Sequence, residues 1–67
     1  MVWSRWVEDT ISHIFYMYDI KSKTEQQKKL KRICINELHA HPEIKAEIRN
    51  DKQMEYFVVQ MALESIQ

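Results

Sequence analysis

The sequence predicts an all-α protein, a compact small helical bundle of three longer helices and one short helix. The chain has 67 residues, no glycine and a single proline. Tight turns between β-strands depend on glycine at positive φ, so the lack of glycine disfavours a sheet. Apolar residues instead recur at helical spacing in four segments. A chain of this length has one small core, so we expect residues 1–67 to form a single domain.

The first expected helix runs from Trp3 to about Ile20. At about 100° per residue, its apolar side chains gather on one half of the helix, and most of its charged side chains lie on the other. The apolar half consists of Trp3, Trp6, Val7, Thr10, Ile11, Ile14, Phe15, Met17 and Tyr18. This pattern predicts an amphipathic helix that buries one broad face.

The second helix is expected to begin between Ser22 and Thr24. Both residues start a capping box, Ser22 with Glu25 and Thr24 with Gln27, in which side chains satisfy the first backbone N–H groups. The helix should end near His41, because Pro42 restricts the residue before it and suits the first turn of a new helix. Its apolar side consists of Leu30, Ile33, Cys34 and Leu38.

A short third helix from Pro42 to Arg49 offers Ile44 and Ile48 to the core. Asn50 and Asp51 are favourable N-cap residues for a fourth helix that ends near Ile66. The core side of this fourth helix is expected to consist of Met54, Phe57, Val58, Met61, Ala62 and Ser65.

The fourth helix carries a second apolar stripe on another side. Either this helix is central and covered by the other three, or the second stripe is an interface. The simplest interface is a two-fold homodimer, so we expect a dimer. The two tryptophans of the first helix are either core anchors or aromatic anchors of an interface. The expected interface residues are Tyr56, Val59, Leu63, Ile66, Trp3 and Trp6.

The most uneven charge distribution lies in residues 21–32. This segment holds six of the ten basic residues and one carboxylate, Glu25, although the whole chain has ten acidic and ten basic residues. Three interpretations are open. The segment is the solvated face of a helix, a surface that attracts and orients an acidic protein, or a surface that binds nucleic-acid phosphates. The candidate partner-binding residues are Lys21, Lys23, Lys28, Lys29, Lys31 and Arg32.

Catalysis and metal binding are not indicated. Cys34, His39 and His41 match no zinc-binding spacing, and the chain has no glycine-rich phosphate loop. A helix-turn-helix is also disfavoured, because its recognition helix would carry Glu43 and Glu47 towards the DNA backbone. We therefore expect no enzyme, no cofactor, no metal and no small-molecule substrate.

One further polar residue, Glu37, falls on the apolar side of the second helix, where His41 at i+4 is a plausible partner. The single cysteine excludes an internal disulfide, and no stretch reaches the roughly 18 apolar residues of a membrane span. The N-terminal segment also lacks the features of a signal peptide. We therefore expect a cytoplasmic protein that does not bind membranes.

Together these features predict a small non-catalytic regulatory, adaptor or inhibitor protein. It is expected to bind a protein with an acidic surface through its helix faces, as a homodimer. The alternative is a nucleic-acid-binding protein that uses residues 21–32.

Overall fold

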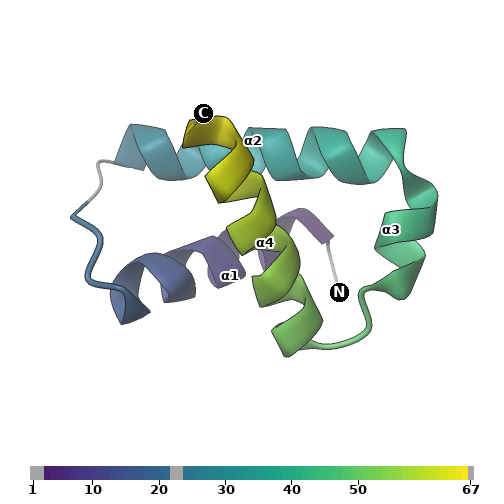
Figure 1. Ribbon diagram of the computed structural model, residues 1–67, viewed down its shortest axis with the longest axis horizontal. Coiled ribbons are helices and arrows are strands. Elements are labelled where there is room, and N and C mark those ends of the chain that lie inside the picture. Colours follow the sequence, from purple (N-terminus) through teal and green to yellow (C-terminus); the bar gives the residue numbers. More distant parts are fainter. Residues whose placement is uncertain (1–2, 22–23, 67) are drawn as a thin grey trace.

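The computed structural model describes residues 3–21 and 24–66, the last of these by its backbone. These residues form four helices and no strand (Figure 1). The helices are α1 (Trp3–Met17), α2 (Thr24–Ala40), α3 (Pro42–Glu47) and α4 (Asp51–Ile66). The prediction of three longer helices and one short helix is confirmed.

The helices α1 and α2 lie beside each other, and α4 crosses both of them (Figure 1). The short helix α3 follows the end of α2 and returns the chain towards the start of α4 (Figure 1). The protein measures 32 × 23 × 18 Å, with a radius of gyration of 11.1 Å. Only one shared core fits in this volume, and every longer helix contributes to it.

The core lies where α4 crosses α1 and α2. Four of its side chains are completely buried: Val7, Cys34, Met54 and Val58. The other buried apolar residues are Ile11, Ile14, Leu30, Leu38, Ile48 and Phe57. All of these side chains belong to the apolar positions expected from the sequence, so helical periodicity predicted the core well.

The end of α1 differs from the prediction. The helix ends at Met17, three residues before Ile20, because Asp19 adopts a left-handed conformation with φ 51°. The Ile20 N–H donates to the Phe15 carbonyl at 2.9 Å, and the Asp19 N–H donates to the Tyr16 carbonyl at 3.2 Å. This is the hydrogen-bond pattern of a Schellman motif, with aspartate in the position that glycine usually occupies.

The early end of α1 has a consequence for its last apolar residues. Met17 and Tyr18 were expected on the core side, but their side chains are 59% and 67% exposed. The prediction was wrong for both residues, because it assumed helical spacing up to Ile20. Met17 is the last residue of α1 and Tyr18 lies beyond its end, so neither side chain packs over the core.

The other helix boundaries follow the sequence signals more closely. The helix α2 ends at Ala40, immediately before His41 and Pro42, and α3 ends two residues before the expected Arg49. The cap of α4 is Asn50, whose side-chain oxygen accepts the Gln53 N–H at 2.9 Å.

On α4, Ser65 was expected on the core side but is exposed. Its hydroxyl donates to the Ala62 carbonyl at 2.9 Å. Near the end of α4 the hydroxyl is thus satisfied within its own helix and has no need of a core partner.

Candidate functional site

A groove of about 580 Å³ runs between α1 and α2. We call it the α1–α2 groove. Its lining residues recur every three or four positions on each helix, so each helix contributes one of its faces. From α1 these residues are Ser4, Glu8, Ile11 and Ser12; from α2 they are Thr24, Gln27, Lys28, Lys31, Arg32, Ile35 and Asn36.

The lining of the α1–α2 groove has more positively than negatively charged side chains. Lys28, Lys31 and Arg32 lie on α2, and Glu8 on α1 is the only carboxylate among the described residues of the lining. Apolar side chains are also present: Ile11 is buried, and Ile35 is half-buried against the core. The groove therefore combines a positive side with an apolar base.

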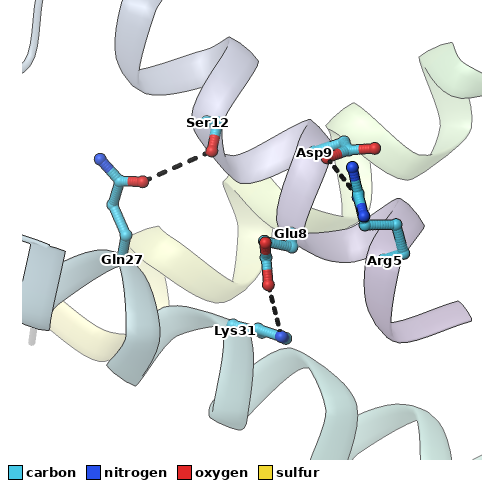
Figure 2. A network of polar contacts seen from close by, with 6 residues as sticks. All are labelled: Arg5, Glu8, Asp9, Ser12, Gln27 and Lys31. Atoms are coloured by element: carbon cyan, nitrogen blue, oxygen red, sulfur yellow. Dashed lines mark hydrogen bonds and ion pairs between the residues drawn. The ribbon is translucent and has the colours of Figure 1, made fainter.

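Among the residues that the structure describes, two polar contacts join α1 to α2 across the groove, as Figure 2 shows. The Lys31 ammonium donates to the Glu8 carboxylate at 2.6 Å. The Ser12 hydroxyl donates to the Gln27 side-chain oxygen at 3.5 Å, near the outer limit for a hydrogen bond. In contrast, the ion pair of Arg5 and Asp9 stays within α1 at 3.2 Å.

The Glu8–Lys31 ion pair lowers the pKa of the Glu8 carboxyl. The hydrogen bond from Lys31 is the largest cause, followed by the positive charge of the same side chain. Both side chains remain partly exposed, at 53% for Glu8 and 34% for Lys31. Water and salt screen such a pair, so it orients the two side chains more than it stabilises the fold.

We expect an NMR titration to place the pKa of Glu8 below its ordinary value of 4.5. A carboxyl with a lowered pKa in the folded state stabilises the fold above its unfolded pKa, and this contribution is lost as the pH falls through the folded pKa. Replacing Lys31 by methionine should return the pKa of Glu8 towards 4.5. The matched Lys29→Met variant should leave it low, and equal pKa values in the two variants would contradict the assignment.

The structure divides the six basic residues predicted from the sequence. Lys28, Lys31 and Arg32 line the α1–α2 groove, whereas Lys21 and Lys29 are exposed outside its lining. The sixth, Lys23, lies outside the described residues.

The contact between this face of α1 and the basic residues of α2 was not predicted from the sequence. The prediction placed most charged side chains of the first helix, Glu8 among them, on the half away from the core and gave Glu8 no partner. The available signal was the spacing of Ser4, Glu8 and Ser12, which places three polar residues on one line along the helix.

The second predicted interface lies on α4. Tyr56 and Leu63 are 70% and 53% exposed, whereas Val59 is half-buried against the core. Tyr56 also lines a second groove, of about 540 Å³, between α3 and α4. The side chain of Ile66 lies outside the described part of the chain.

The two tryptophans are half-buried against the core. Their ring centroids are 5.1 Å apart. The Trp6 indole N–H donates to the Asp51 carboxylate at 2.8 Å, and the Lys45 ammonium lies 5.0 Å from the centre of the Trp3 ring. The tryptophans thus connect α1 to α3 and to the start of α4.

The residues considered as metal ligands do not converge. Across residues 3–21 and 24–66, no group of three His, Cys, Asp or Glu side chains is placed to hold a metal ion. Cys34 is buried, which raises the pKa of its thiol to about 12 and keeps it protonated.

His41 lies between two carboxylates at the junction of α2 and α3. It contacts Glu43 at 3.0 Å, whereas the expected partner Glu37 is 3.9 Å away. The pKa of Glu43 is lowered by its own backbone N–H and then by His41.

None of the helices in the described ranges has the length and apolar character needed to cross a membrane.

No protein-family model matches this chain, and comparisons with curated proteins and with solved structures find no significant similarity.

Proposed function

We propose that this chain is a small non-catalytic regulatory, adaptor or inhibitor protein that binds an acidic segment of another protein. One observation carries the proposal: three cations of α2 line one side of a groove with an apolar base. Opposite charge steers and orients a partner, and apolar contact supplies affinity. The protein would then act by occupying its partner's surface, with no chemical step.

The α1–α2 groove suits an acidic helical segment better than nucleic acid. A phosphate backbone presents negative charge along its whole length, and its binding depends on many cationic contacts. Here the whole chain is neutral in formal charge, and Glu8 lies inside the groove. An amphipathic helix instead places a few carboxylates beside an apolar stripe, which complements Ile11, Ile35 and the neighbouring cations.

A titration followed by fluorescence anisotropy tests this proposal. The probe is a labelled amphipathic peptide of about 18 residues, with leucine along one face and glutamate beside it; at ~1.5 Å per residue it matches the length of α2. We call it the acidic probe. Its control, the neutral probe, has glutamine in place of every glutamate. A labelled generic DNA duplex is titrated in parallel.

We expect the acidic probe to bind about fivefold more tightly than the neutral probe at low salt, because Lys28 and Arg32 each gain an exposed ion pair worth roughly 0.5 kcal/mol, whereas Lys31 is already paired with Glu8. The difference should shrink at high salt. Equal affinity for the two probes, or no binding of either, would contradict the proposal. Tighter binding of the DNA duplex would favour the nucleic-acid alternative.

We also propose that the chain forms a homodimer through the outer side of α4. The exposed side chains of Tyr56 and Leu63 support this proposal, because homodimer interfaces are rich in aromatic and apolar surface and closed symmetric pairs are the commonest oligomers. Light scattering over a range of concentrations tests it, and a constant monomer mass would refute it.

We also propose a cytoplasmic location. It is supported by Cys34, a free and buried cysteine, because free thiols are typical of proteins in a reducing compartment.

A further inference from the structure

The three cations of the α1–α2 groove differ in their partners. Lys31 is paired with Glu8 at 2.6 Å. Within residues 3–21 and 24–66, no carboxylate lies within ion-pairing distance of Lys28 or Arg32. Since Lys28 and Arg32 are four positions apart on α2, they lie on the same side of the helix, one turn from each other. An acidic helix in the groove could therefore form ion pairs with Lys28 and Arg32 directly, whereas Lys31 is already paired with Glu8.

The occupied cation is held by a contact that a ligand can replace. The Glu8 carboxylate and the Lys31 ammonium are both partly exposed, so water reaches the pair and exchange leaves no buried charge unpaired. The neighbouring contact between Ser12 and Gln27 is long, at 3.5 Å, and is equally replaceable. The two contacts that span the groove are therefore weak enough to open without unfolding the helices.

We propose that Glu8 is an internal competitor for the acidic segment: the segment binds by displacing the Glu8 carboxylate from Lys31 with a carboxylate of its own. This inference rests on the proposed function and adds a site and a regulatory contact to it. The ion pair keeps the groove partly neutralised when no partner is present. A ligand without a carboxylate at the right position would leave Lys31 unpaired if it displaced Glu8, so the pair favours acidic partners.

The test compares Glu8→Gln with Asp9→Asn in the titration of the acidic probe. Both variants remove one negative charge from neighbouring residues of α1, but Asp9 pairs with Arg5 and does not line the α1–α2 groove. We expect Glu8→Gln to tighten binding by about threefold relative to Asp9→Asn, since one exposed competing ion pair is removed. Adding Lys31→Met to Glu8→Gln should abolish the gain.

A second measurement needs no variant. When the acidic probe saturates the unmodified protein, the pKa of Glu8 measured by NMR should rise, because Glu8 loses Lys31 and gains a negative neighbour. If the acidic probe binds but the pKa of Glu8 stays low and both variants behave alike, the competition is overturned and the proposed function stands. If the acidic probe does not bind any of these proteins, the proposed function itself fails.

Discussion

Replacing Met54 by alanine is expected to remove about 3 kcal/mol from the free energy of unfolding. Met54 is completely buried in the cluster where α4 crosses α1 and α2. Truncating a buried methionine to alanine costs about 2–5 kcal/mol, from lost burial and from the cavity left behind. A domain of this size has a total stability of roughly 3–10 kcal/mol, so this loss is between about a third and all of it.

The matched control is Met17→Ala, the same substitution on a side chain that is 59% exposed. We expect it to change the free energy of unfolding by less than about 0.5 kcal/mol. Urea denaturation followed by circular dichroism measures both variants. Equal losses at the two positions would mean that α4 does not pack across α1 and α2 as described.

Much of this fold was predictable because its signals are local. Pro42 marks the end of α2 and the start of α3, and Asn50 caps α4 through a neighbour three residues away. The buried core positions follow from the period of the helix, although the same period also placed the exposed Met17, Tyr18 and Ser65 on the core side. Such signals need no knowledge of how the helices pack against each other.

The end of α1 was harder to predict. A chain without glycine has no obvious residue to end a helix in the left-handed conformation, and Asp19 takes that position. Aspartate adopts positive φ more readily than most residues, but it is also common inside and beside helices. The periodicity of Met17 and Tyr18 therefore outweighed it in the sequence analysis.

The α1–α2 groove could not be predicted from the sequence, because it depends on which faces of two helices approach each other. Glu8 and Lys31 are 23 positions apart, and each alone is typical of a solvated face. The basic segment was recognised, but its division into Lys28, Lys31 and Arg32 inside the groove and Lys29 outside it depends on the packing. A helix wheel describes one helix and cannot supply the partner face.

Reversing two charges of the groove is expected to have the largest effect on binding. In the variant Lys28→Glu/Arg32→Glu, each substitution removes an attraction to the acidic probe and adds a repulsion of similar size. With roughly 0.5 kcal/mol for each of these four effects, affinity should fall about thirtyfold at low salt. Both side chains are exposed, so the fold should persist, which circular dichroism will check.

The direct test of the α1–α2 groove is to titrate this variant beside Lys21→Glu/Lys29→Glu with the acidic probe. Both double variants change the net charge equally, but Lys21 and Lys29 do not line the groove. The groove account predicts the thirtyfold loss for Lys28→Glu/Arg32→Glu and a loss of only about threefold for the control, from the long-range field alone. Equal losses in the two variants would show that the acidic probe responds to the net charge of the protein, and would contradict the groove as its binding site.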